Sequence, residues 1–121
     1  IQPGYIAHDY GDALRSGANT TYEDDSNLEN VHFDLDYAKS FTKGFLKPLQ
    51  EDLLESEKQS LWMGVEVIVF EQALRFLTDY LNGDTYYKID YPTHNLVRAK
   101  NQIQLFKDIK EKESQIQQFF L

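Results

Sequence analysis

The sequence predicts an all-α protein, and two patterns along its 121 residues indicate this fold class. Apolar residues recur every three or four positions over four segments, which is the spacing that gathers side chains on one face of a helix. Glycine, asparagine or proline follows these segments and is typical of helix ends. One short run, Val65–Phe70, is rich in β-branched residues, but the helical spacing on both sides of it outweighs this local preference for a strand.

Four helices are expected, and they are expected to form one helical unit over residues 1–121. The first is expected from about His8 to Ser16, where Asp9 can accept hydrogen bonds from backbone N–H groups at the helix start. Gly17 is a suitable stop, because glycine tolerates the left-handed backbone found just beyond helix ends. The acidic segment 18–30 is expected to be a solvated loop.

The second helix is expected to begin at Leu35 behind the capping residue Asp34 and to stop before Pro48. The third is expected over residues 56–81 and to end at the Asn82-Gly83 pair. Its apolar side chains cover much of its circumference, so it is predicted to be the central helix of the core.

A short aromatic connection over residues 84–91 leads to the last helix, which is expected to start at Pro92 and Thr93. Apolar residues spaced three or four apart continue this helix to Ile109. The segment 107–118 is rich in charged and amide side chains, so the far end of the helix is expected to be solvated.

The composition argues against several partners. A formal charge of −8 and a pI near 4.7 leave no basic stripe for a nucleic acid. The longest apolar stretch, Leu61–Phe70, is interrupted by Glu66 and is too short to cross a bilayer, so no membrane association is expected. There is no cysteine, hence no disulfide framework or thiolate zinc site, and a cytoplasmic location is expected.

Arg75 and Tyr86 flank the most informative segment, because a charged side chain lies within a strongly apolar helix shortly before an aromatic loop. The simplest interpretation of Arg75 is a surface ion pair with Glu71, four residues before it. Tyr86 is by spacing alone more typical of the edge of a core. The alternative interpretation is a ligand site, in which a guanidinium among apolar residues is compensated by sugar hydroxyls.

Asp9, Asp12 and Arg15 recur every three residues and are therefore expected on nearly one face of the first helix. Helix capping and an ion pair between residues three apart explain this spacing. The alternative is a polar brace that supports an active site.

No metal site is expected. His8, His32 and His94 lack the spacing of metal ligands, and residues 23–27 lack the glycine and the oxygen pattern of a calcium-binding loop. Phosphate-binding glycine loops and nucleophile elbows are also absent, so no catalytic residue is identified in the sequence. Asn19-Thr20-Thr21 matches a glycosylation acceptor, which is relevant only in a secreted protein.

Several blocks follow one another along the chain in a distinctive order: Pro3–Arg15, Gly17–Thr20, Val31–Leu35, Thr42–Phe45, Arg75–Leu81, Gly83–Tyr86 and His94–Leu96. Taken together, they resemble the C-terminal part of N-acetylhexosamine 1-kinases, which are sugar kinases of the aminoglycoside phosphotransferase and choline kinase-like superfamily with a protein-kinase-like fold. The resemblance covers nearly the whole chain.

The resemblance implies that the chain is the helical C-terminal subdomain of a kinase-like fold. The catalytic and magnesium-binding aspartates, the nucleotide-binding lobe, and with them ATP and Mg²⁺, would belong to a segment before residue 1, so the chain alone is expected to be inactive. Arg75 and Tyr86 match sugar-binding positions, and Asp9 and Asp12, with Arg15, match a block that braces the catalytic and metal loops. Ser16 departs from the family pattern, in which a phenylalanine is expected.

Two other hypotheses compete with the kinase. One is an acidic helical module that binds a partner protein. The other, a mucin-desulfating sulfatase or its regulator, is disfavoured because sulfatase chemistry needs a modified Cys or Ser in a C/S-x-P-x-R context that the sequence lacks. Apolar surface that a missing lobe would otherwise cover is also expected to promote self-association.

Overall fold

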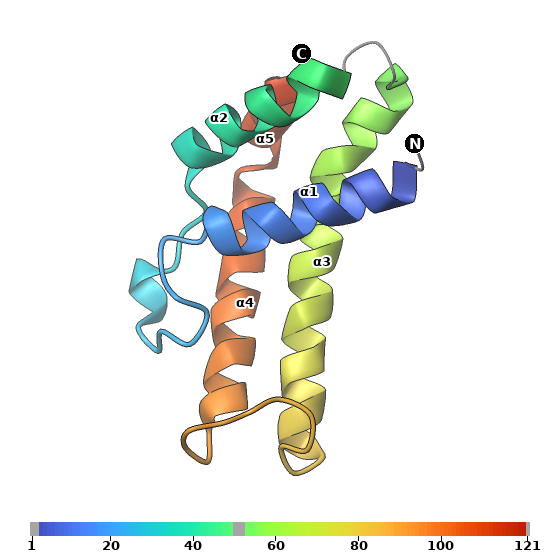
Figure 1. Ribbon diagram of the computed structural model, residues 1–121. Helices are drawn as coiled ribbons and strands as arrows, with labels where there is room; N and C mark the ends of the chain where they lie inside the picture. Colours follow the sequence, from blue (N-terminus) through green and yellow to red (C-terminus); the bar gives the residue numbers. More distant parts are fainter. Residues whose placement is uncertain (1–2, 50–52, 121) are drawn as a thin grey trace.

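Figure 1 shows the computed structural model, which describes residues 3–49 and 53–120. The α-helices are α1 (Pro3–Gly17), α2 (Leu35–Leu46), α3 (Glu55–Leu81), α4 (His94–Glu111) and α5 (Glu113–Gln117), and three short 3₁₀ turns are η1 (Leu28–Asn30), η2 (Lys47–Leu49) and η3 (Gln118–Phe120). Within the described residues, β structure is limited to an isolated bridge between Asn19 and Phe33. The prediction of an all-α fold with a long central helix is confirmed.

The two longest helices form the frame of the molecule. α3 and α4 run antiparallel and side by side, and α1 crosses them near their middle (Figure 1). α2 and α5 lie at one end of this pair, whereas the connection between α3 and α4 lies at the opposite end. The hydrophobic core fills the space between α1, α2, α3 and the second half of α4.

The predicted start of the first helix is wrong. α1 begins at Pro3, well before His8, because proline fits the first helical turn, where its missing N–H has no intrahelical partner to lose. Asp9 consequently lies in the interior of α1, exposed to solvent, and does not cap the helix. The helix ends at Gly17, within one residue of the predicted boundary.

Two glycines allow α1 and α3 to cross at close range. A Cβ atom on Gly11 would lie 2.8 Å from the carbonyl oxygen of Gly64, and a Cβ atom on Gly64 would lie 3.1 Å from the carbonyl oxygen of Ala7. Larger residues at these positions would hold the two backbones apart. The crossing is surrounded by buried side chains, namely Tyr10, Leu14, Leu61, Val65 and Val69.

α2 begins where the sequence predicts, since Asp34 Oδ1 accepts a hydrogen bond from the backbone N–H of Tyr37 at 3.0 Å. The helix packs an aromatic group against α1. Tyr10 of α1 is fully buried and its hydroxyl lies 2.6 Å from Thr42 Oγ1. Burial raises the pKa of Tyr10 to about 12, although the Thr42 hydrogen bond acts in the opposite direction. The rings around it are Phe41, Phe45 and Phe120.

α3 has 27 residues and ends at Leu81, as predicted. The predicted stop at the Asn82-Gly83 pair is confirmed, although Asn82 itself has a φ of −91° and is not left-handed. Gly83 and Asp84 have positive φ values of 90° and 59° instead and turn the chain away from the helix. Glycine reaches this conformation without the steric cost of a side chain, so Gly83 is the residue that makes the stop possible.

The predicted solvation of the end of the last helix is also wrong for several side chains. Asp108, Ile109 and Ile116 are buried, the last of them in α5, a helix that the sequence did not predict. Asp108 Oδ2 accepts hydrogen bonds from the backbone N–H of Phe33 and from Lys112 Nζ, both at 2.6 Å. This charged pair ties the start of α2 to the end of α4.

One carboxylate of α3 faces the other long helix. Glu66 has a side chain only 13% exposed, and its Oε2 lies 3.5 Å from Lys110 Nζ, which in turn lies 2.6 Å from Glu113 Oε1. Burial first, and then the hydrogen bond and negative charge of Glu113, raise the pKa of Glu66 to about 7. Its Oε1 is buried without a hydrogen-bond partner among the described residues.

Glu66→Gln is therefore expected to stabilise the protein at pH 8. A carboxyl whose pKa is raised on folding favours the folded state when it is protonated. Its contribution is therefore fully present below its unfolded pKa of 4.5, is lost as the pH rises to about 7, and stays low above that. The neutral amide removes this loss, with an expected gain of about 1–2 kcal/mol at pH 8 and almost none at pH 4.5.

Urea unfolding at both pH values measures this difference. The control is Glu71→Gln, which removes an exposed carboxylate from the same helix and should change the free energy of unfolding by less than about 0.5 kcal/mol. Equal stability changes for Glu66→Gln at the two pH values would show that folding does not raise the pKa of Glu66.

Candidate functional site

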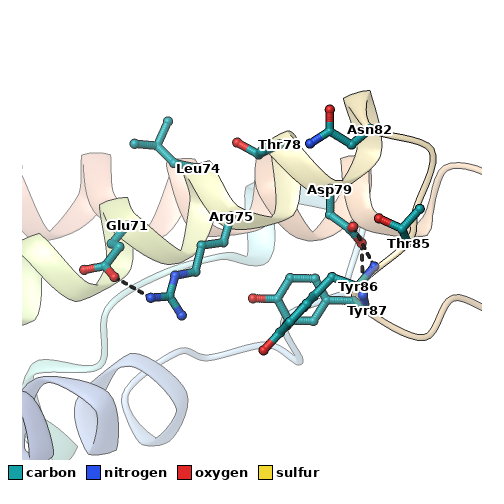
Figure 2. A pocket seen from close by; sticks show the side chains of 9 residues that line it. All are labelled: Glu71, Leu74, Arg75, Thr78, Asp79, Asn82, Thr85, Tyr86 and Tyr87. Carbon is teal, nitrogen blue, oxygen red and sulfur yellow. Dashed lines mark hydrogen bonds and ion pairs between the residues drawn. The ribbon is translucent and has the colours of Figure 1, made fainter.

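Arg75 and Tyr86, the two predicted sugar-binding residues, line the same hollow. It has a volume of about 530 Å³ and lies between the C-terminal part of α3 and the loop that follows it. Figure 2 shows that Arg75 leaves α3 on the same side as Tyr86 and bends toward Glu71, while Leu74, Thr78 and Asn82 lie along another edge of the helix. We call this space the Arg75 hollow.

The ion pair predicted for Arg75 is present. Its Nη2 lies 2.9 Å from Glu71 Oε1, and the Arg75 side chain is 60% exposed. The idea that the guanidinium lies in apolar surroundings is therefore wrong, because Arg75 projects from the solvated side of α3. Nε and Nη1 of Arg75 have no hydrogen-bond partner among the described residues, so their N–H groups are available to a ligand acceptor.

Tyr86 is 80% exposed, so its ring is not the edge of the core. Its neighbour Tyr87 is partly buried and packs against Phe76, with ring centroids 4.8 Å apart. The Tyr86 and Tyr87 rings meet edge to face at the same distance. An exposed aromatic face held by a packed neighbour is a suitable platform for the apolar face of a sugar ring.

The loop that carries Tyr86 is held by Asp79, a residue that the sequence patterns did not predict as part of the site. Asp79 is buried, and its carboxylate accepts backbone hydrogen bonds from Tyr86 at 2.8 Å and Tyr87 at 3.0 Å. The amide of Asn95 donates to the same carboxylate at 2.8 Å and to Asp84 at 3.0 Å. Asp79 therefore joins α3, the loop and α4 at one point.

The pKa of Asp79 reflects two opposing effects. Burial acts to raise it, but the backbone N–H groups of Tyr87, Tyr86 and Thr85 and the amide of Asn95 stabilise the charged form, and the net result is a pKa below the usual value. Asp79 is thus a carboxylate kept ionised by the loop that it organises. Its role is to position Tyr86 rather than to exchange protons.

Only two of the three residues predicted as a brace are in contact. Arg15 Nε lies 3.3 Å from Asp12 Oδ1, which confirms the ion pair predicted between residues three apart. Arg15 Nη1 also lies 3.1 Å from Glu23 Oε2. Asp9 lies apart on the exposed face of α1. The bracing role of Asp9, Asp12 and Arg15 stays a prediction.

Ser16 lines a smaller hollow of about 200 Å³, together with Arg15, Thr21 and Tyr22. The Ser16 hydroxyl donates weakly to the backbone oxygens of Asp12 and Ala13, at 3.4 and 3.5 Å. A phenylalanine at this position would project toward solvent from the same exposed turn of α1, whereas serine leaves that space open.

The segment 18–30, predicted to be a solvated loop, is tied to α4 by hydrogen bonds. Asn101 is fully buried, and its Nδ2 lies 3.1 Å from each of three acceptors in this loop. The buried ring of His94 accepts from the Asp90 N–H through Nδ1, so Nε2 carries the proton and donates to Asp24 at 3.0 Å. Over residues 3–49 and 53–120, no group of three acidic or histidine side chains could hold a metal ion.

A second surface feature is a row of exposed apolar side chains along one face of α3. Five apolar side chains spaced three, four or seven residues apart are each about half or more exposed: Met63, Val67, Phe70, Leu74 and Leu81. From first to last they span about 27 Å of helix. We call this row the α3 stripe, and Leu74 also belongs to the rim of the Arg75 hollow.

No protein-family model matches the chain. In the part of the chain that the structure describes, none of the helices is both long and apolar enough to span a membrane.

Proposed function

We propose that the chain is the sugar-binding part of an ATP-dependent kinase that phosphorylates the anomeric hydroxyl of an N-acetylhexosamine or a similar sugar. The observation that carries this proposal is the convergence of Arg75 and Tyr86, eleven positions apart, on one hollow. The guanidinium can donate hydrogen bonds to the hydroxyl and carbonyl oxygens of a sugar, and the exposed aromatic ring beside it can pack against the apolar face of the sugar ring.

In this proposal the catalytic aspartate, the magnesium ligands and the ATP site belong to a segment that precedes the chain. Asp9, Asp12 and Arg15 support that segment from α1. Phosphoryl transfer requires nucleotide, metal and acceptor to be positioned together, so the chain alone binds the acceptor without phosphorylating it. We propose the cytoplasm as its location, because ATP is available there.

Titration of the isotope-labelled chain with N-acetylglucosamine and N-acetylgalactosamine, followed by NMR, tests acceptor binding. We expect amide shifts of Thr85, Tyr86 and Tyr87, and at least about tenfold weaker binding for Arg75→Ala. Lys100→Ala, at an exposed position of α4, is the control and should bind as the unmodified chain does.

Phosphate transfer is measured on the longer protein that contains this chain. Consumption of ATP with either sugar is expected, and Arg75→Ala should raise the KM for the sugar without changing the KM for ATP. Unchanged acceptor kinetics in Arg75→Ala would contradict the site assignment.

A second candidate function is association with a protein through the α3 stripe. We propose that the partner is a second copy of the chain, packed antiparallel. A two-fold axis near residue 72 would pair the two ends of the stripe with each other and bring Arg75 of one copy next to Glu71 of the other, so that the charges also match. The five exposed side chains provide a large share of the roughly 800 Å² per partner of a stable interface.

Light scattering across a concentration series tests this candidate. The chain is expected to dimerise at high micromolar concentration, and Val67→Glu should keep it monomeric. Ser40→Glu adds the same charge at an exposed position of α2 and should not change the association. A monomer at every concentration would refute the dimer.

A further inference from the structure

A second polar hollow lies beside the Arg75 hollow and brings three basic side chains together. It has a volume of about 390 Å³ and is lined by Arg15 of α1, Arg98 of α4 and Lys88 of the loop between α3 and α4, with Glu23 as its carboxylate. Three of twelve basic residues thus converge on one space in a chain of net charge −8. We call this space the central hollow.

The charges around the central hollow are not balanced within the protein. Arg15 is matched by two carboxylates, Asp12 at 3.3 Å and Glu23 at 3.1 Å. Arg98 and Lys88, by contrast, have no ion-pair partner among the described residues. The hollow therefore carries an excess of positive charge, in contrast to the acidic character of the whole chain.

The hydrogen bonds of Arg98 fix its guanidinium and leave one edge unused. Both hydrogen bonds of the guanidinium come from Nη1, which donates to the carbonyl oxygen of Lys88 at 3.0 Å and to Asn95 Oδ1 at 2.9 Å. The guanidinium carbon lies 5.6 Å from the centroid of the Phe76 ring. Nε is buried and has no hydrogen-bond partner among the described residues.

The edge formed by Nε and Nη2 is the one that binds carboxylate or phosphate oxygens in a two-pronged manner. Nε is covered in the absence of a ligand. Binding at this edge therefore requires that a side chain at the rim of the hollow rotates away and uncovers Nε. Lys88 is exposed at that rim, and its ammonium group can follow the ligand.

Tyr87 connects the two hollows, since its side chain lines both of them. Its hydroxyl accepts a hydrogen bond from Gln72 Nε2 at 3.0 Å, so its own proton is available to a ligand oxygen. A molecule whose ring lies against Tyr86 can therefore extend a substituent past Tyr87 toward Arg98.

We propose that the central hollow binds the anionic group, a carboxylate or a phosphate monoester, of a sugar whose ring lies in the Arg75 hollow. The position of the ring rests on the function proposed above. The anion site itself rests only on Arg98, Lys88 and Tyr87.

The test is an NMR titration of the isotope-labelled chain at constant ionic strength with five probes: glucose, N-acetylglucosamine, glucuronate, glucose 6-phosphate and inorganic phosphate. We expect glucuronate or glucose 6-phosphate to bind at least about tenfold more tightly than glucose and to shift the Arg98 Nε signal. The stronger of the two identifies carboxylate or phosphate as the preferred group.

Lys88→Gln should reduce this preference for the charged sugar about threefold to tenfold. Its side chain is exposed, so the substitution is expected to leave the fold intact. Lys100→Gln, which removes the same charge elsewhere, should have no effect. Equal binding of charged and neutral sugars, or an equal effect of the two lysine substitutions, would overturn the proposal.

The two proposals can fail separately. If N-acetylglucosamine binds near Tyr86 and the charged sugars gain nothing, the anion site is wrong and the sugar site stands. If inorganic phosphate shifts Arg98 and no neutral sugar binds, the anion site stands and the sugar site is wrong.

Discussion

Asp79→Ala is expected to lower the Tm by more than about 8 °C. The substitution leaves the backbone N–H groups of Tyr86 and Tyr87 and the amide of Asn95 without their common acceptor. A buried donor that loses its partner keeps the cost of having left water, so the loss is larger than that of an exposed hydrogen bond. Thermal unfolding followed by circular dichroism measures the change.

Asp9→Ala is the matched control, because it removes a carboxylate from an exposed position within a helix and should change the Tm by less than about 2 °C. Amide hydrogen exchange provides a local measurement. In Asp79→Asn, which keeps the shape of the side chain, the amides of Tyr86 and Tyr87 should exchange at least about tenfold faster. Unchanged exchange at both amides would contradict the anchoring role.

The pH dependence of the same variant has a defined sign. Since the pKa of Asp79 is lowered on folding, its stabilising contribution is fully present above the unfolded pKa of 3.8 and is lost as the pH falls through the lower folded value. The difference in stability between the unmodified chain and Asp79→Asn should therefore be largest above about pH 4 and shrink in stronger acid. A difference that grows in acid would show that another group is responsible.

Loss of this anchor should also abolish the Arg75 hollow, because Tyr86 belongs to the loop that Asp79 holds. Sugar binding is then expected to weaken in Asp79→Asn even though both proposed contact residues are present. Arg75→Ala, in contrast, should weaken binding without changing the Tm, since the exposed ion pair with Glu71 contributes little to stability.

The helices were predictable from the sequence where local signals agreed. Asp34 before Leu35 and the Gly83 stop after Leu81 mark α2 and α3 by capping chemistry that acts over a few residues. The start of α1 could not be predicted in this way, because Pro3 and Gly4 are as typical of a loop as of a first helical turn. α5 is too short for periodicity, and its burial depends on residues distant in the sequence.

The candidate site was predictable only in part. Arg75, Tyr86 and the ion pair of Arg75 with Glu71 were predicted, but the exposure of both side chains depends on which face of α3 meets the core. Asp79 could have been predicted from its position. It lies three residues after Phe76, on the buried face of α3, where a carboxylate needs fixed hydrogen-bond donors. Arg98 was not predicted: Asn95 lies only three residues before it, but its contacts with the Lys88 carbonyl oxygen and the Phe76 ring depend on how the loop and α3 pack against α4.

The contact between α1 and α3 leads to the second large effect, which concerns the backbone rather than a side chain. Gly11→Ala is expected to destabilise the protein by about 1–3 kcal/mol, since its Cβ would lie 2.8 Å from the carbonyl oxygen of Gly64. A backbone oxygen within a helix cannot rotate away as a side chain can. The two helices would have to separate, and the buried contacts of Tyr10 and Val65 would loosen. Urea unfolding measures the change.

Gly44→Ala separates this packing effect from the preference of alanine for helices. Gly44 lies in α2, and a Cβ there meets no atom within 4 Å, so the same exchange should stabilise the protein by about 0.5–1 kcal/mol. The two substitutions are chemically identical and are expected to have opposite signs, because only one of them lies where two helices touch. If Gly11→Ala also stabilised the protein, α1 and α3 could not cross at the distance described, and the placement of Arg15 beside Arg98 would be wrong with it.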